Sequence, residues 1–211
     1  MPDLSDRRRL LKTAVASLAV GVSSNSLAMM ALTPRAAAGP FYPDLELLDD
    51  DNDLTRVKGI AGTAKGDITD LTGRVLDRNG APIRDARVEI WQCDINGRYR
   101  HSRENANREM DESFQGFGIS HSDNNGLYRF RTIKPTHYPG RTPHIHFLVE
   151  IPGEHQLITQ MYIDGESANQ GDFLFNRMSD EQQRLASVAF EPDTASNRLK
   201  AHFDIVLGYS A

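Results

Sequence analysis

The chain has 211 residues, of which 39% are hydrophobic and 25% are charged, and its 24 basic and 29 acidic residues give a formal net charge of −5. This composition is typical of a folded globular domain and excludes collagen, a coiled coil and wholesale disorder, and the acidic balance argues against a nucleic-acid partner. The single cysteine, Cys93, excludes an internal disulfide framework and any metal site built on several thiolates.

The beginning of the chain differs in composition from the rest. Arginine and lysine residues precede a modestly apolar stretch over residues 13–22, and small residues follow it up to Ala38. This order is typical of an export signal, and the paired arginines before Leu-Leu-Lys resemble a twin-arginine signal. The apolar stretch is shorter than the roughly 20 residues of a spanning helix, so stable membrane insertion is not expected. We therefore expect residues 1–38 to be a signal removed after Ala38 or after Ala28, and the remaining domain, residues 39–211, to be periplasmic or extracellular.

Most of the remaining chain reads as short strands separated by turns. Alternating or apolar runs predict strands over residues 71–76, 86–91, 127–132, 144–151, 157–163 and 203–207. The Asn79-Gly80 pair predicts that the first two of these strands form a hairpin. Residues 39–56 are expected to be an extended segment that wraps the strands.

One helix is expected, over residues 179–190. Ser179 and Gln182 form a capping box, and an apolar stripe of Leu185, Val188 and Ala189 follows. Together these elements predict an all-β fold: a β-sandwich with long loops and one short C-terminal helix.

Candidate metal ligands concentrate around residues 137–147. His144 and His146 lie two positions apart on a predicted strand, so their side chains point the same way with Cα atoms about 7 Å apart, close enough to share one metal. The pair alone is a weak signal. Two tyrosines add possible oxygen ligands, namely Tyr138 on the preceding loop and Tyr99 after the second predicted strand.

The chemistry of these side chains favours one metal over others. A phenol titrates about three pH units above neutrality, so holding it as a phenolate costs roughly 4 kcal/mol. Only a strongly Lewis-acidic ion offsets the cost of ionising both tyrosines. Two phenolates with two neutral imidazoles suit ferric iron, whereas the common ferrous oxygenase site uses two histidines and one carboxylate.

Several ordered segments between residues 39 and 207 resemble the intradiol ring-cleavage dioxygenases, especially the protocatechuate 3,4-dioxygenase branch. The most informative segments are Gly39-Pro40-Phe41-Tyr42, Val88-Glu89-Ile90-Trp91-Gln92, Gly97-Arg98-Tyr99-Arg100-His101, Pro143-His144-Ile145-His146-Phe147 and Leu157-Ile158-Thr159-Gln160-Met161-Tyr162. The resemblance implies a non-haem Fe(III) enzyme that uses dioxygen to cleave a catechol-type diol to a cis,cis-muconate-type product.

The resemblance also assigns roles to residues. It implies that the iron ligands are Tyr99, Tyr138, His144 and His146. Tyr138 would leave the metal when substrate binds and would take one of its protons. Arg141 and Gln160 match the pair that lines the substrate pocket, where a guanidinium can stabilise negative charge and an amide can orient bound groups.

The chain departs from relatives in this family at two places. Gly140 stands where protocatechuate enzymes tend to have tryptophan, and the loop from Gly140 to Pro143 is shorter than theirs, so recognition of a substrate carboxylate stays open. The helical N-terminal dimerisation segment of catechol 1,2-dioxygenases has no counterpart in residues 39–70. The sequence therefore leaves the oligomeric state open, with a homo-oligomer as one option.

Two other interpretations remain. The strands suit an exported transthyretin-like β-sandwich binding module without iron, although such a module requires none of the candidate ligands. A ferrous extradiol-type oxygenase would use His144, His146 and a carboxylate.

Overall fold

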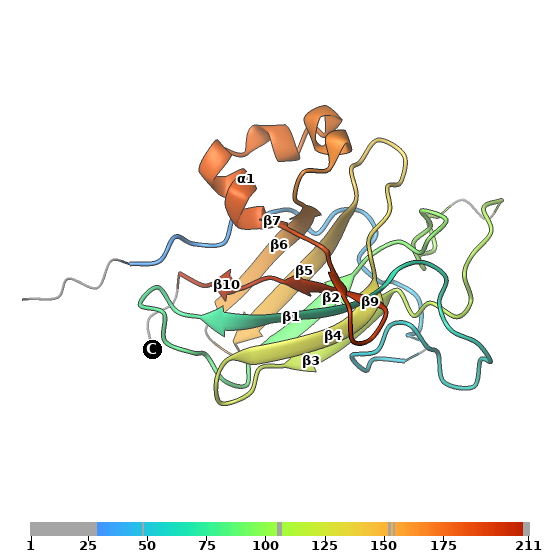
Figure 1. Cartoon of the computed structure of the whole chain (residues 1–211), viewed down its shortest axis with the longest axis horizontal. Helices are drawn as coiled ribbons and strands as arrows, with labels where there is room; N and C mark the ends of the chain where they lie inside the picture. The colour runs from blue at the N-terminus through green and yellow to red at the C-terminus, as the bar shows by residue number, and fades with distance from the viewer. Residues whose placement is uncertain (1–28, 48, 105–106, 152, 154, 209–211) are drawn as a thin grey trace, which may run out of the picture.

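A computed structural model describes residues 29–47, 49–104, 107–151, 153 and 155–208 of the chain. It is a sandwich of two five-stranded sheets with long loops and one short α-helix, which confirms the predicted all-β fold (Figure 1). Residues 1–28, the larger part of the predicted export signal, lie outside the described residues.

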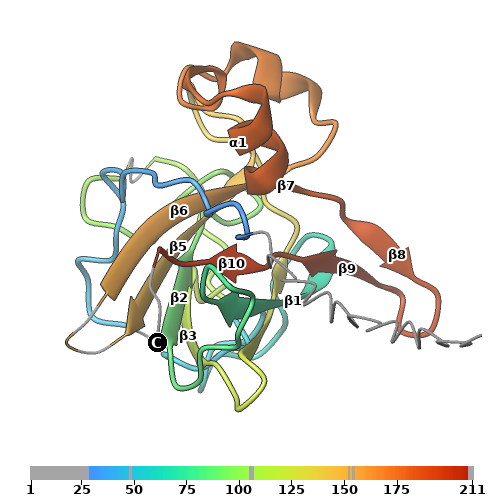
Figure 2. The ribbon, with the colours of Figure 1, turned by 90° about the vertical axis from the view of Figure 1, so that its left-hand side faces the viewer.

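The first sheet is built around a long strand with partners on both edges. Its strands are β1 (Ile68–Leu76), β4 (Leu127–Ile133), β8 (Glu191–Asp193), β9 (Arg198–His202) and β10 (Ile205–Val206). Strand β1 pairs antiparallel with β4 and parallel with β9 and β10, and β8 extends the sheet beyond β9. The β8 and β9 strands project to one side of the sandwich (Figure 2).

The second sheet has the order β3-β2-β5-β6-β7. Its strands are β2 (Arg87–Trp91), β3 (Phe117–His121), β5 (His144–Ile151), β6 (His155–Ile163) and β7 (Ser187–Val188). Strand β5 lies at the centre between β2 and β6 and pairs antiparallel with both. Every residue of β5 has a partner on β6, and residues 146–150 also have one on β2.

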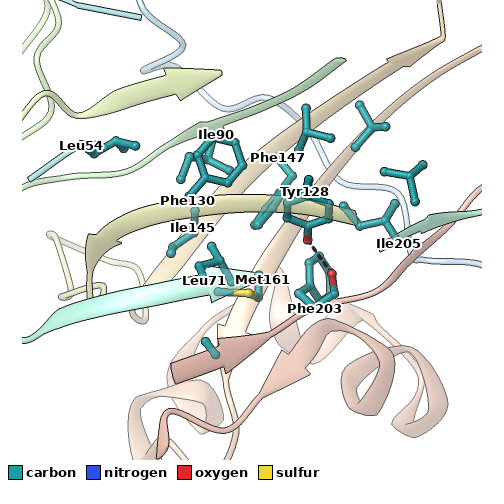
Figure 3. Packing of buried hydrophobic residues seen from close by; sticks show 14 of the residues in the cluster. Leu54, Leu71, Ile90, Tyr128, Phe130, Ile145, Phe147, Met161, Phe203 and Ile205 are labelled. Carbon is teal, nitrogen blue, oxygen red and sulfur yellow. Dashed lines mark hydrogen bonds between the residues drawn. The ribbon is translucent and has the colours of Figure 1, made fainter. Parts of the chain in front are cut away.

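Apolar side chains from both sheets fill the space between them (Figure 3). Ile145, Phe147 and Val149 of β5 are fully buried in this core. The hydroxyl of Tyr128 donates to the carbonyl of Phe203, so the largest polar group of the core is satisfied. Because strand residues alternate faces, the histidines of β5 point to the opposite, outer face of the second sheet.

The helical segments lie together after β6. They are the 3₁₀ helices η1 (Ser167–Gly171) and η2 (Phe175–Arg177) and the helix α1 (Asp180–Ala186). The capping box of Ser179 and Gln182 is present. The predicted extension of the helix to residue 190 is wrong, because Ser187 is already extended and β7 pairs with the end of β6. At Ser187 and Val188 the backbone hydrogen-bonding groups pair with the edge of β6 and so do not need another helical turn.

The predicted hairpin between the first two strands is also wrong. The Asn79-Gly80 turn exists, since the Gly80 amide donates to Asp77 O and Gly80 has a φ of 82°. The turn nevertheless connects two sheets, with β1 in the first and β2 in the second. A turn signal specifies a local reversal, whereas strand partners depend on which face each strand buries.

The segment before β1 lies along the sandwich and holds to it by backbone bonds. The amides of Thr33 and Ala36 donate to the carbonyls of Val206 and Ile158, at 3.1 and 2.8 Å. The Thr33 hydroxyl accepts the amide of Val206 in return, at 2.8 Å. The packed structure therefore includes residues before position 39. Within the described part of the chain, no helix is long and apolar enough to cross a membrane.

Candidate metal centre

The predicted site residues gather on the outer face of the second sheet. In register, His144 lies opposite Tyr162, and His146 lies between Gln160 on β6 and Trp91 on β2. This face is covered by the N-terminal segment and by the loops that carry the tyrosines, so both histidines are only 1% exposed. A strand face that would otherwise meet water is thus covered, and its histidines are buried.

The two imidazoles face each other. Their Nε2 atoms lie 3.1 Å apart, and His144 Nδ1 lies 2.7 Å from the carbonyl oxygen of Thr142. Because a carbonyl accepts only, Nδ1 of His144 carries the hydrogen and its Nε2 presents a lone pair. Burial, reinforced by the charge of Arg141, lowers the pKa of His144 to about 4. Burial and the neighbouring His144 lower the pKa of His146 well below its usual value, so both rings are neutral, the form that binds metals.

Tyr99 and Tyr138 bring two phenols to the histidine pair. The ring centroids of the two tyrosines are 5.2 Å apart, that of Tyr99 lies 6.1 Å from His146, and that of Tyr138 lies 5.6 Å from His144. The four side chains that the resemblance assigned as ligands therefore lie side by side.

Two buried polar atoms of this cluster have no hydrogen-bond partner among the described residues, namely the phenol oxygen of Tyr99 and Nδ1 of His146. Buried polar atoms are rarely left unpaired in native proteins. Burial raises the pKa of Tyr99 well above its usual value, and it also raises that of Tyr138, although Arg141 opposes the latter shift. The phenols need a nearby cation to ionise.

These observations test whether a ferric ion fits the residues. Among the described residues, no group of three or more His, Cys, Asp and Glu side chains could hold a metal. A metal at the histidine pair would therefore need the phenols, and hard anionic oxygens with neutral imidazoles suit Fe(III). The donor set fits the ion that the sequence predicts.

Arg141 connects the phenols to a hydrogen-bond network. Its Nη2 lies 2.8 Å from Oε1 of Gln160 and 3.3 Å from the hydroxyl of Tyr162, and its Nη1 lies 3.5 Å from the hydroxyl of Tyr138. On its other side, Nε forms a 2.7 Å ion pair with Asp172. The guanidinium is thereby held with its Nη1 atom next to the hydroxyl of Tyr138.

Asp172 holds the Arg141 side chain in position through its carboxylate. One carboxylate oxygen accepts from Arg141 and from the amide of Thr142, at 2.7 and 3.0 Å, and the other accepts from the amides of Leu174 and Phe175, both at 2.9 Å. Burial acts to raise the pKa of Asp172, but these hydrogen bonds outweigh it and the pKa is lowered. The buried group is a carboxylate that joins the Arg141 loop to η2.

Aromatic side chains and the N-terminal segment pack against this cluster. Trp91 stacks on His146 with ring centroids 4.8 Å apart and planes within 5°, and Phe41 stacks on Tyr99 at 4.9 Å. Nearby, the carbonyl of Ala37 accepts from Nε2 of Gln160 at 3.2 Å. A Cβ on Gly39 would lie 3.3 Å from the ring of His146, and its φ of 75° favours glycine.

Sequence reasoning missed three residues of the site: Tyr162, Asp172 and Phe41. Tyr162 lies two positions after Gln160 on the same strand face, so the alternation rule could have found it. Asp172 carries no local signal, since its partner is 31 positions away along the chain. Phe41 was part of a recognised segment, but its contact with Tyr99 depends on the path of the loop.

Comparison with known proteins gives consistent matches. Residues 37–208 match a family described as Dioxygenase. The protocatechuate 3,4-dioxygenase beta chain of Burkholderia cepacia is 36% identical over 82% of this chain and 78% of its own length. The hydroxyquinol 1,2-dioxygenase of Corynebacterium glutamicum is 29% identical over 90% of this chain and 68% of its own length.

Solved structures agree with this match. The dioxygenase domain of a carbohydrate-binding fusion protein from Streptomyces sp. SirexAA-E superposes with a TM-score of 0.65 at 26% identity, covering 85% of this chain and 100% of that domain. An intradiol ring-cleavage dioxygenase from Tetranychus urticae has a TM-score of 0.66 at 24% identity, over 84% of this chain and 94% of its own, and supports the fold.

Proposed function

Because the chain belongs to the intradiol dioxygenase family and is an aromatic ring-cleavage dioxygenase, we propose that it depends on non-haem Fe(III) and converts a catechol-type diol and dioxygen to a cis,cis-muconate-type product. The proposed ligands are Tyr99, Tyr138, His144 and His146. The observation that carries this proposal is the buried cluster of two neutral imidazoles and two phenols, in which the two imidazole Nε2 atoms face each other at 3.1 Å and the phenol oxygen of Tyr99 lacks a partner among the described residues. The bound ion would supply Lewis acidity that stabilises the phenolates and activates a bound diol.

The two tyrosines have different environments, which suggests different tasks. Tyr99 is 2% exposed and lies under Phe41, so its phenol oxygen is out of reach of solvent. Tyr138 is only half-buried and faces Arg141. As a phenolate, Tyr138 is therefore the better placed of the two to accept a proton from a substrate hydroxyl at its own oxygen.

The network around Arg141 would bind and orient the diol. The guanidinium is preorganised by Asp172, so it can stabilise negative charge on the reacting ring without rearranging. Gln160 is held at both ends of its amide, by Ala37 and by Arg141, and would orient bound oxygen atoms. Burial of these side chains strengthens each of these interactions by excluding water.

Purified protein loaded with ferric iron tests the proposal. We expect one iron per chain, a visible phenolate-to-iron absorption band, and oxygen uptake with catechols. Tyr138→Phe should shift the band and slow turnover. Tyr128→Phe is the matched control, because Tyr128 lies in the sandwich core away from the site, and it should keep the band. A colourless protein that binds no ferric iron would contradict the proposal and favour a binding module.

We also propose that the chain is exported by its twin-arginine-like N-terminal segment. Of the two possible cleavage positions, the one after Ala28 would keep the backbone bonds of Thr33 and Ala36 to the sandwich, whereas the one after Ala38 would remove them. The mass of the protein recovered from the periplasm or medium of an expressing bacterium tests both points. Retention of the full-length protein in the cytoplasm would contradict export.

A further inference from the structure

Two aromatic rings connect the candidate metal centre to the surface of the protein. Trp91, the single tryptophan of the chain, stacks on His146 with ring centroids 4.8 Å apart. Trp91 also contacts the ring of Tyr42, edge to face, with centroids 5.0 Å apart. Trp91 is 1% exposed, whereas Tyr42 is 39% exposed, more than any other tyrosine of the described residues. A continuous aromatic contact therefore joins a buried proposed ligand to solvent.

Both rings of this contact belong to the types that lose an electron most easily. Indole and phenol rings are oxidised far more readily than the ring of phenylalanine. The ring that covers Tyr99 is Phe41, so the contact from Tyr99 through Phe41 offers no comparable route. The contact through Trp91 and Tyr42 is thus suited to the transfer of single electrons between the centre and the surface.

The hydroxyl of Tyr42 has a proton acceptor in place. It donates to Oε2 of Glu89 at 2.7 Å, and the Glu89 side chain is 1% exposed and forms an ion pair with Arg87. Burial raises the pKa of Tyr42, so the phenol keeps its proton in the resting protein. A phenol that loses an electron becomes a strong acid, and a carboxylate at hydrogen-bond distance can take the proton as the electron leaves.

Trp91 differs from Tyr42 in this respect. Its indole Nε1 is buried and has no hydrogen-bond partner among the described residues. An oxidised indole that cannot release its proton stays a strong oxidant, whereas an oxidised phenol that passes its proton to Glu89 does not. The local hydrogen bonding therefore drives oxidation from Trp91 to Tyr42 and toward the surface.

We propose that Trp91 and Tyr42 carry single electrons from the surface to the candidate centre, so that the protein reduces a peroxide there and oxidises external phenols at the exposed ring of Tyr42. The peroxide half of this inference rests on the proposed function, because the iron supplies the reducible centre. No phenol has to reach the buried histidines, so phenols too bulky for the centre are expected substrates.

Each passage moves one electron and one proton. Tyr42 gives an electron through Trp91 to the centre and its proton to Glu89, which returns the proton to solvent. A phenol at the surface then transfers a hydrogen atom to the tyrosyl oxygen and restores Tyr42. Two passages break the O–O bond of one hydrogen peroxide, whose oxygens take two electrons and two protons from solvent, and yield two waters and two phenoxyl radicals.

Photo-oxidation of the single tryptophan tests the path without iron. A laser flash excites Trp91 in the iron-free full chain beside a dissolved electron acceptor, and transient absorption follows the radicals. The tryptophan radical should decay as a tyrosyl radical appears. Tyr42→Phe, which keeps the ring against Trp91, should abolish the tyrosyl signal and prolong that of tryptophan. Glu89→Gln should slow the transfer. Unchanged transfer in Tyr42→Phe would overturn the inference.

Tyr128→Phe is the matched control for the flash experiment. Tyr128 contacts Phe130 and Phe147 in the core, so its loss should leave the transfer from Trp91 to Tyr42 as it was. A tyrosyl signal that disappears in this variant instead of in Tyr42→Phe would also contradict the proposed path.

The iron-loaded protein tests the activity itself. With hydrogen peroxide, electron paramagnetic resonance of frozen samples should show a tyrosyl radical, and a bulky phenol should be oxidised. Tyr42→Phe should lose both signals and keep the cleavage of catechol. A wild-type protein that cleaves catechol but forms no tyrosyl radical with peroxide would refute the proposal. A protein that binds no iron would instead contradict the proposed function, and the flash experiment would still decide on the path.

Discussion

Replacing Asp172 with asparagine should weaken both the fold and the site. The variant keeps the size of the side chain but removes the negative charge that pairs with Arg141 at 2.7 Å. The Asp172 side chain is fully buried and that of Arg141 is 9% exposed, so the remaining cation cannot be solvated in its place. Breaking one side of a buried pair costs about 3–5 kcal/mol, and we expect the lower end because the amide oxygen can still accept a hydrogen bond.

The effect on catalysis follows from the role of Arg141. Without its ion pair, the guanidinium loses a hydrogen bond to a charged group, and such a bond contributes about 1.5–3 kcal/mol. If that energy serves to orient Arg141, kcat/KM should fall by roughly 10- to 100-fold. The visible band should also shift, since Arg141 Nη1 contacts the phenol of Tyr138 at 3.5 Å.

A double-mutant cycle separates positioning from simple destabilisation. Asp172→Asn, Arg141→Met and the combined variant are compared in kcat/KM, iron content and thermal unfolding. If Asp172 acts through Arg141, the combined variant should be no slower than Arg141→Met alone. Asp164→Asn, the same change on an exposed side chain before η1, should leave stability and turnover as they were. Additive losses in kcat/KM would refute the reasoning.

The Asp172–Arg141 ion pair also predicts how the stability difference between the wild-type protein and Asp172→Asn depends on pH. The pKa of Asp172 is lowered from 3.8 in the folded protein, so its stabilisation is complete above that value and is lost as the pH falls through the lower folded-state pKa. Unfolding free energies of the two proteins should therefore converge in strong acid. A constant difference down to the lowest accessible pH would contradict the assigned ionisation.

Three further predictions concern the fold that carries the site. A chain that begins at Gly39 should have a free energy of unfolding roughly 2–4 kcal/mol lower than one that begins at Met29, because it lacks the hydrogen bonds of Met30, Thr33 and Ala36 to the sandwich. Denaturant titration of the two chains measures the difference, and equal stability would show that this segment contributes nothing. Gly73→Ala should leave little folded protein, because its Cβ would lie 1.9 Å from the carbonyl oxygen of Phe203, whereas Gly171→Ala meets nothing within 4 Å and should fold normally in a solubility and circular-dichroism comparison. Tyr128→Phe should lower the free energy of unfolding by about 1–3 kcal/mol, because it leaves the carbonyl of Phe203 without that donor, and urea titration measures the loss; an unchanged midpoint would argue that another donor takes its place.

Much of the second sheet could be predicted because its strands carry strong local signals. The expected strand over residues 144–151 coincides with β5, whose side chains alternate between the core and the outer face. The same alternation placed His144 and His146 together. Strand β3 of this sheet was not predicted, and neither were β8 and β9 of the first sheet. Strands β8 and β9 are short, partly exposed and polar, and are defined by pairing with each other and with β1.

Contacts between distant segments could not be predicted from local pattern. The Asn79-Gly80 turn was identified but its two strands were joined wrongly, because register and partner depend on the whole sheet. The helix was expected to continue through Val188, yet pairing with Ile163 decides in favour of a strand there. The link from Asp172 to Arg141 has the same origin, since only the folded chain brings η2 to the loop before β5.

The fold holds the side chains of the four proposed ligands with unequal rigidity, and this difference bears on the role of each. His144 and His146 stand on the central strand of the second sheet, backed by the core residues that alternate with them, so their positions are set by the packing of the whole sandwich. Tyr99 is buried and clamped by Phe41. Tyr138 stands on a loop with its side chain only half-buried, and Arg141 is the residue that donates to its hydroxyl. Among the four side chains that would hold the ion, Tyr138 therefore has the most room to move, and its phenol oxygen is the best placed to take up a proton.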